Sequence, residues 1–321
     1  MRNKSLRLVP LAVLLLTLLS TQSHSQSLTA GSGRYEIGFG FGPMFFLGDL
    51  GGSAGVGRGF VKDVDFPLTK ISKSLYASYH PSEFLGFRLA LNQGVLQGND
   101  AQAPNKGGAE VDRLQRNLSF KTNVFEGYLA AEFYPTVFLE QYDGLRGKLR
   151  PYGLIGIGLM KFNPKAKDID GSWVPLQPLH LEGQGMAEYP ESKPYKLIQK
   201  EIPMGVGFKY YVKENMYIGM EVLHRVLFTD YIDDVSSDSY IDESLFASYL
   251  PAPQAAQAQR LYYRGTYSLY GTNANLAGLE RGDPKQNDAF FSTILRFGWR
   301  LNDQNDPGLR ARKQLRCPVF Y

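Results

Sequence analysis

The side chains best suited to chemistry in this sequence are its histidines and one dense run of carboxylates. The histidines are His24, His80, His180 and His224. None stands beside a serine or a carboxylate in a recognised nucleophile arrangement, and no pair has the spacing of metal ligands. The sequence therefore predicts no catalytic residue, no bound cofactor and no metal site built on histidine.

The carboxylates gather in the segment T-D-Y-I-D-D-V-S-S-D-S-Y-I-D, from Thr229 to Asp242. Its oxygens could hold Ca²⁺ in a loop, but their spacing is not that of an EF-hand. We favour solvated loop acids, or ion-pair partners for basic residues at the rim of the fold. An enzyme would need a cluster at that rim, such as His180 with Asp230 or Ser236.

Other charged residues recur at every second position of segments that look like β-strands. Over Lys200–Leu227, apolar side chains alternate with small or polar ones at a strict period of two, interrupted by a turn at Val212–Asn215. That period is typical of a strand, and the pattern predicts a hairpin with one apolar face. The opposite face is rich in glycine and carries charges, including Lys209, Glu221 and Arg225.

Similar segments along the chain give eight predicted strands. Besides the two in Lys200–Leu227, they lie near 34–42, 71–79, 84–97, 118–134, 152–162 and 291–300. The connections run long, short, long, medium, long, short and very long. This alternation predicts an all-β, eight-stranded antiparallel up-and-down transmembrane β-barrel, with long extracellular loops and short periplasmic turns. An even number of strands places both termini in the periplasm.

The charges on the glycine-rich face of the predicted strands decide between a membrane barrel and a soluble one. A soluble lipocalin-like barrel would carry apolar side chains inside, whereas here the inner face would hold nine charged residues, tolerable only when paired and hydrogen-bonded. Eight strands enclose a space that side chains can fill, so we expect ion pairs rather than a wide pore. A proton or ion path through them is the alternative. The predicted lumen network is Glu36, Arg88, Glu126, Glu132, Lys209, Glu221, Arg225, Arg296 and Arg300.

The start and composition of the chain indicate export. Three basic residues precede an apolar run over 8–19 and a small, polar zone, which is typical of a secretory signal peptide, cut after Ser25. Removing residues 1–25 takes three positive charges from the net +4 of the 321-residue chain and leaves +1, which gives no reason to expect nucleic acid as a partner. We therefore expect a signal peptide at 1–25, an outer-membrane barrel in contact with lipid at 26–301 and a periplasmic tail at 302–321.

Four segments together resemble the PorG-like family of outer-membrane β-barrels. They are Y-E-I-G-F-G-F-G with G-D-L-G-G, W-V-P-L-Q-P-L-H-L-E-G-Q-G, T-D-Y-I-D-D-V-S and R-C-P-V-F. The resemblance extends from the first strand to the last residues. The loop residues that carry it are Gly48, Asp49, Gly51, Gly52, Trp173, Glu182, Gly183, Gln184, Gly185, Asp230, Tyr231, Asp233 and Asp234.

The resemblance implies a non-catalytic part in type IX secretion and gliding. PorG-like proteins associate with a periplasmic ring built by a lipoprotein and its partner, and help to fasten that ring to the outer membrane. Contact would then be made by the turns at 80–83, 135–150 and 212–215 and by the tail, whose candidate contact residues are Arg312, Lys313, Arg316, Cys317 and Pro318.

Two alternatives remain open at this stage. The basic tail could be an ordinary solvated one, and Cys317 could be an incidental free thiol instead of an intermolecular contact. The whole protein could also be a stand-alone barrel that binds a ligand or a surface partner through its long loops, 163–199 and 229–287.

Overall fold

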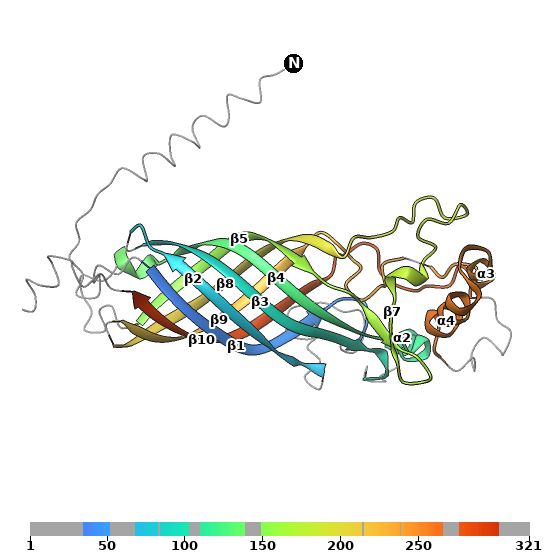
Figure 1. Ribbon diagram of the computed structural model, residues 1–321, viewed down its shortest axis with the longest axis horizontal. Helices are drawn as coiled ribbons and strands as arrows, with labels where there is room; N and C mark the ends of the chain where they lie inside the picture. The colour runs from blue at the N-terminus through green and yellow to red at the C-terminus, as the bar shows by residue number, and fades with distance from the viewer. Residues whose placement is uncertain are drawn as a thin grey trace, which may run out of the picture.

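The chain folds into a closed β-barrel with a folded cap at one end (Figure 1). The computed structural model describes residues 35–51, 68–82, 84–102, 110–138, 149–213, 215–237, 239–265 and 276–301. The predicted signal peptide and periplasmic tail lie outside these residues. The barrel strands are β1 (Tyr35–Leu47), β2 (Lys70–Tyr79), β3 (Leu85–Asn99), β4 (Ser119–Phe133), β5 (Leu149–Lys161), β8 (Ile198–Lys213), β9 (Met216–Leu227) and β10 (Ala289–Leu301).

Each barrel strand pairs antiparallel with the next one along the chain. The circle closes where β1 pairs with β10, from Tyr35 opposite Leu301 to Leu47 opposite Ala289. Closure satisfies the backbone groups of both outer strands, which a sheet in lipid requires. The prediction of an eight-stranded up-and-down barrel is confirmed.

Several strand boundaries differ from those predicted. The first strand does not end at Gly42 but continues to Leu47, since Met44 and Phe45 pair with Ser292 and Phe291 of β10. Alternation fails there because Met44, Phe45 and Phe46 are all buried. Arg150 belongs to β5 instead of the preceding connection, and β8 runs on through Val212 and Lys213.

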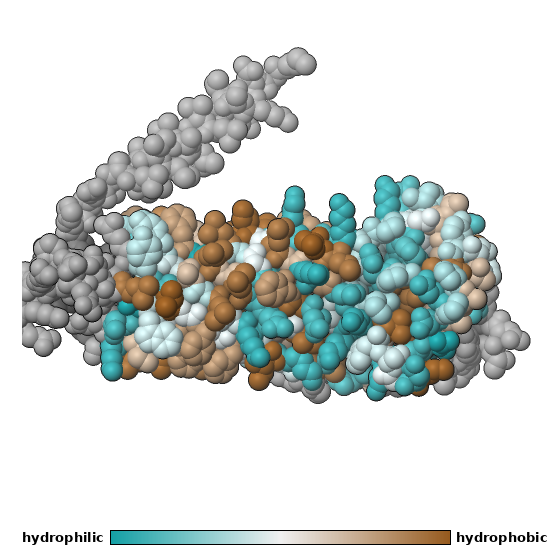
Figure 2. Space-filling view, viewed as in Figure 1, coloured by the Kyte–Doolittle hydropathy of each residue, from teal (hydrophilic) through white to brown (hydrophobic). Residues whose placement is uncertain are grey.

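The outer face of the barrel is apolar over much of its height (Figure 2). Exposed aromatic rings gather near the end with the short turns, where the Tyr35 and Tyr79 rings pack at a tilt, with their centroids 5.1 Å apart. An outward apolar band with an aromatic girdle is the surface of a membrane-spanning barrel. The exposed side chains of this belt include Ile37, Phe39, Phe41, Leu75, Tyr79, Phe87, Leu89, Leu91, Leu129, Phe133, Ile155, Ile157, Val206, Phe208, Tyr210 and Trp299.

The cap lies at the opposite end, where the long loops gather (Figure 1). Its regular elements are the hairpin β6 (Lys165–Lys167) and β7 (Trp173–Pro175), with α2 (Glu110–Arg116), α3 (Phe246–Tyr249) and α4 (Ala252–Tyr262). Short 3₁₀ turns add η3 (Asp100–Gln102), η6 (Gln177–Leu179) and η7 (Glu243–Leu245), while η4 (Pro135–Phe138) lies at the other end of the barrel. In the described part of the chain, no helix is both long and apolar enough to cross a membrane.

The cap has a hydrophobic core of its own. Ile232, Phe246, Ala258 and Tyr262 are fully buried in it, and the core continues into the barrel mouth through Phe290. The connections predicted as plain loops therefore form a packed layer over one end of the barrel.

Candidate functional site

The structure places all nine predicted lumen residues on the inner face of the barrel, each at most 7% exposed. Every second side chain of a strand points inward, so one period-of-two pattern per strand is enough to bring charges from six strands together. The charges sort into one large network near the end with the short turns and a smaller one nearer the cap.

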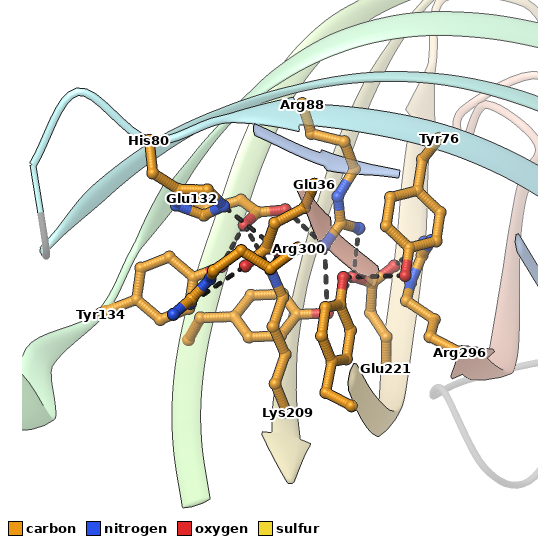
Figure 3. A network of polar contacts seen from close by, with 12 residues as sticks. Glu36, Tyr76, His80, Arg88, Glu132, Tyr134, Lys209, Glu221, Arg296 and Arg300 are labelled. Carbon is orange, nitrogen blue, oxygen red and sulfur yellow. Dashed lines mark hydrogen bonds and ion pairs between the residues drawn. The ribbon is translucent and has the colours of Figure 1, made fainter. Parts of the chain in front are cut away.

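The large network begins at Lys209 (Figure 3). Its Nζ lies 2.6 Å from Oε2 of Glu36 and 3.3 Å from Oε2 of Glu132. Arg300 reaches the second oxygen of Glu36 at 3.2 Å, and Nε2 of His80 lies 3.3 Å from Oε2 of that carboxylate. Side chains from β8, β10 and the turn after β2 are therefore tied to a single acid, Glu36.

Arg88 links this cluster to a third acid, Glu221. Its guanidinium pairs with Glu132, and Nη1 lies 2.5 Å from Oε2 of Glu221. Glu221 also accepts hydrogen bonds from Arg296 and from the Tyr152 hydroxyl. The acids and bases thus form one connected chain across the lumen, as Figure 3 shows.

The smaller network joins Arg225 to Glu126. Two guanidinium nitrogens of Arg225 lie 2.8 and 2.9 Å from the two carboxylate oxygens, the bidentate geometry of a strong pair. Asn92 donates to the same carboxylate at 3.1 Å. Beside it lies Glu201, an inward acid that sequence reasoning missed, although it shares the parity of Lys209 on the same strand. Arg150, also inward and buried, was missed as well.

Tyrosine rings occupy the space between the ion pairs. The hydroxyls of Tyr76 and Tyr217 are 2.8 Å apart, and the Lys209 ammonium lies 4.9 Å from the Tyr217 ring centre. Glycine is needed opposite these rings, because a Cβ on Gly298 would lie 2.2 Å from Cζ of Tyr217. Rings and ion pairs together fill the lumen at this level, which is the arrangement of a structural plug.

Loop residues from three of the segments that resemble the PorG-like family meet in the cap. In G-D-L-G-G, the Leu50 amide donates to Asp233 at 3.2 Å across 183 residues of sequence. The Gly51 amide donates to Asp100 at 3.0 Å, and Gly51 has a φ of 84°, which favours glycine. The Asp49 carboxylate accepts from the amide of Asp283 at 2.8 Å, and Gly48 faces Asp288. Gly52 lies outside the described residues.

The E-G-Q-G segment supplies the central acceptor of the cap. Glu182 accepts from Arg281 at 2.9 Å and from the amides of Ser236 and Ser237 at 2.9 and 3.0 Å. Gly183 and Gly185 have φ angles of 71° and 81°, which explains the two glycines. The Gln184 side chain accepts from the Glu182 amide at 3.1 Å. Trp173 does not join this cluster; it is exposed on β7, under the Lys121 ammonium.

The D-Y-I-D-D-V-S segment completes the cluster. Asp234 accepts from the Tyr195 hydroxyl at 2.6 Å, and the Tyr231 ring stacks on Tyr195 at 4.6 Å. The Ile232 amide donates to Asp288 at 2.8 Å. Glu182, Asp49 and this segment are therefore held by one buried set of polar contacts.

For Asp230, Asp233 and Asp234 the interpretation as solvated loop acids was wrong. Asp233 and Asp234 are each 1% exposed and Asp230 is 8% exposed, because the loops fold over them. Burial raises the pKa of Asp230 to about 8 and that of Asp234 to about 7, and neighbouring carboxylates add to both shifts. Burial also raises the pKa of Asp233 and Asp288. No three His, Cys, Asp or Glu residues of the described ranges are arranged to hold a metal ion.

The other predicted features separate in space or lie outside the structure. His180 has a left-handed backbone, with a φ of 49°, and burial lowers its pKa. Among the described residues, no hydrogen bond or ion pair joins it to Asp230 or Ser236. The tail residues Arg312, Lys313, Arg316, Cys317 and Pro318 all lie outside the described ranges.

No family model and no curated protein matches this chain. Among solved structures it is similar to Neisserial surface protein A, with 8% identity and a TM-score of 0.38 over 84% of this chain and 97% of that one. It is also similar to the outer membrane protein OprG from Pseudomonas aeruginosa, with 11% identity and a TM-score of 0.36 over 85% and 98%. A third is Ail, the attachment invasion locus protein of Yersinia pestis, with 9% identity and a TM-score of 0.34 over 84% and 99%.

Strand closure, the exposed apolar belt and the aromatic girdle make this chain an integral β-barrel of the outer-membrane type.

Proposed function

We propose that this protein is a non-catalytic outer-membrane component of type IX secretion, which anchors or organises the periplasmic ring complex at the membrane. The proposal rests on the resemblance of its loop segments to the PorG-like family. It is supported by one structural observation: Asp49, Glu182 and the 230–234 segment, which carry that resemblance, meet in a single cluster that is buried at Glu182, Asp233 and Asp234 and half-buried at Asp49. Their common task is to hold the cap together, as expected of features that a barrel family retains for its fold.

The filled lumen also favours an anchoring role. Ion pairs and tyrosine rings occupy the interior from Glu36 to Arg225, and each of the paired charges is buried. A barrel of this kind offers surfaces instead of a passage, so its work is done at its ends. We assign the cap to the extracellular side and the end with short turns to the periplasm, since long loops face outward in such barrels.

In this orientation the first and last described residues, Tyr35 and Leu301, both lie at the periplasmic end of the barrel, because they pair with each other. The tail from Asn302 then begins beside the ring complex. The turn at His80 lies on the same side and is fastened to the lumen through Glu36.

Affinity purification from gently solubilised outer membranes of the native host tests this proposal. A tagged full-length protein is compared with one truncated after Leu301, and with one in which Arg312, Lys313 and Arg316 are replaced by glutamine. The ring lipoprotein and its partner should be recovered with the full-length protein and lost with both variants. Recovery of a heat-modifiable barrel alone from every strain would refute the anchoring role.

A stand-alone barrel that binds through its extracellular loops is the second candidate. It is favoured by the packed cap, whose core around Phe246 and Tyr262 presents a fixed outer surface instead of loose loops. Replacing residues 244–287 by a short Gly-Ser linker should then abolish function, while truncation after Leu301 leaves it intact. The anchoring role predicts the reverse pattern.

A further inference from the structure

Four lysines face outward on neighbouring strands just above the apolar belt, at its cap end. Lys161 and Lys200 are exposed, while Lys121 and Lys165 are half-buried. The strand register brings them together: Lys200 lies opposite Leu159, two residues from Lys161, and Lys121 lies opposite Lys165. Diagonal neighbours of this kind have Cα atoms about 7 to 8 Å apart. We call these four residues the lysine face.

The lysine face sits at the edge of the membrane. On the same outward face, Phe125 lies opposite Lys161, Leu159 lies opposite Lys200, and Ile157 follows two residues further from the cap; all three are exposed and apolar. Lysines at such a boundary lay their methylene stems along apolar residues and hold their ammonium groups at headgroup level. The lysine face therefore meets lipid headgroups, whichever proteins lie beyond them.

These four ammonium groups have no acidic partner in the described part of the chain. The only ion-like contact there is between Lys121 and the Trp173 ring, at 5.2 Å. Meanwhile Lys121 and Lys165 stand directly opposite each other, and like charges in that position destabilise a sheet. The nearby inward acids, Glu126 and Glu201, point into the lumen and are buried. An anion from outside the chain would supply the negative charge that these four lysines lack among the described residues.

We propose that the lysine face binds phosphate groups of lipid headgroups in the membrane leaflet on the cap side. It offers two levels of positive charge. Lys161 is paired with Phe125 and Lys165 with Lys121, so the levels are four residues apart, roughly 13 Å along the strand. A headgroup with two separated phosphates can engage both levels at once.

Native mass spectrometry of the full-length protein in neutral detergent tests the assignment. The probes are diphosphorylated lipid A, the same lipid after phosphatase treatment, and inorganic phosphate. A triple variant, Lys161→Gln with Lys165→Gln and Lys200→Gln, is compared with a control of equal charge change, Lys193→Gln with Lys213→Gln and Lys285→Gln, whose lysines are exposed outside the lysine face. Lys121 is left unchanged because its ammonium group lies over the Trp173 ring.

The expected result is binding of the diphosphorylated lipid that the first triple variant weakens by roughly 100-fold, from the contribution of three basic residues at an anionic surface. The control triple and the wild type should bind alike. Should the triple variant fail to fold, Lys200→Gln alone should weaken binding about fivefold. Equal losses in both triples, or equal binding of the dephosphorylated lipid, would overturn the proposal. Inorganic phosphate that competes at the same concentration as the lipid would assign a free-anion site instead.

Discussion

Replacing Glu221 by glutamine should destabilise the barrel strongly. Glu221 is 1% exposed and pairs with both Arg88 and Arg296. Arg88 keeps a second carboxylate, Glu132, whereas Arg296 has Glu221 as its only acidic partner among the described residues. Glutamine preserves the volume but leaves a buried guanidinium uncompensated, which costs about 3 to 5 kcal/mol of the free energy of unfolding.

The assay is a urea titration of the protein folded in phosphatidylcholine vesicles, followed by tryptophan fluorescence and by heat-modifiable mobility on gels. Trp299, in the aromatic girdle, reports the barrel. An exposed acid of the cap provides the control: Glu243→Gln should change stability by less than about 0.5 kcal/mol. Adding Arg296→Met to Glu221→Gln removes the unpaired charge. The double variant should therefore lose less free energy of unfolding than the sum of the two single variants, by at least about 1 kcal/mol.

A loss below about 1 kcal/mol for Glu221→Gln would refute this reasoning. It would mean that water or a dissolved anion reaches Arg296, so that the lumen is wet at that level instead of filled by protein.

Other predictions concern the lumen and the cap. In planar bilayers the wild-type barrel should show no lasting open channel, because its interior is filled; steady single-channel currents would contradict this. Gly298→Ala should slow folding into vesicles and reduce the heat-modifiable fraction by forcing a methyl group into a tyrosine ring, whereas Gly153→Ala, whose Cβ meets nothing within 4 Å, should fold like the wild type. The pKa of Asp230 is raised from 3.8 to about 8, so the folded cap holds a proton that the unfolded chain releases. The contribution of Asp230 to cap stability should be full below pH 3.8 and fall as pH rises to about 8, seen as smaller hydrogen-exchange protection factors of cap amides, and Asp230→Asn should remove this contribution while that of Asp234 remains. Glu182→Gln should leave the buried Arg281 unpaired and cost the cap about 3 to 5 kcal/mol, measured as earlier proteolytic cleavage of the cap with the barrel still intact.

The barrel could be predicted because each strand carries its own signal. Successive side chains of a strand point alternately to the lipid and to the lumen, so the sequence shows that Lys209 and Arg296 face the lumen without showing what each contacts. The signal fades above the membrane, where both faces of a strand are covered. That is why the end of β1 beyond Gly42 was missed. Glu201 lies near the start of β8, where the outer face is still exposed, so its inward parity with Lys209 was readable from the sequence although it was left out of the lumen set.

The cap could not be predicted, because its contacts join positions far apart in sequence. Asp233 reaches Leu50 and Asp49 reaches Asp283 across 183 and 234 residues, and no local pattern records either pairing. Burial of the acids follows from those pairings. The helix α4 had a fainter local signal: alanine-rich sequence after Pro251, with Ala255, Ala258 and Leu261 buried at helical spacing.

The pairing of β1 with β10 also fixes when the barrel can close during biogenesis. The first strand to emerge during synthesis must wait for the last, since Tyr35 pairs with Leu301 and Arg300 crosses the seam to Glu36. Until then both outer strands present unpaired edges, which invite pairing with other chains. Contacts between such distant positions form slowly, so the chain depends on protection of its edges from export until closure.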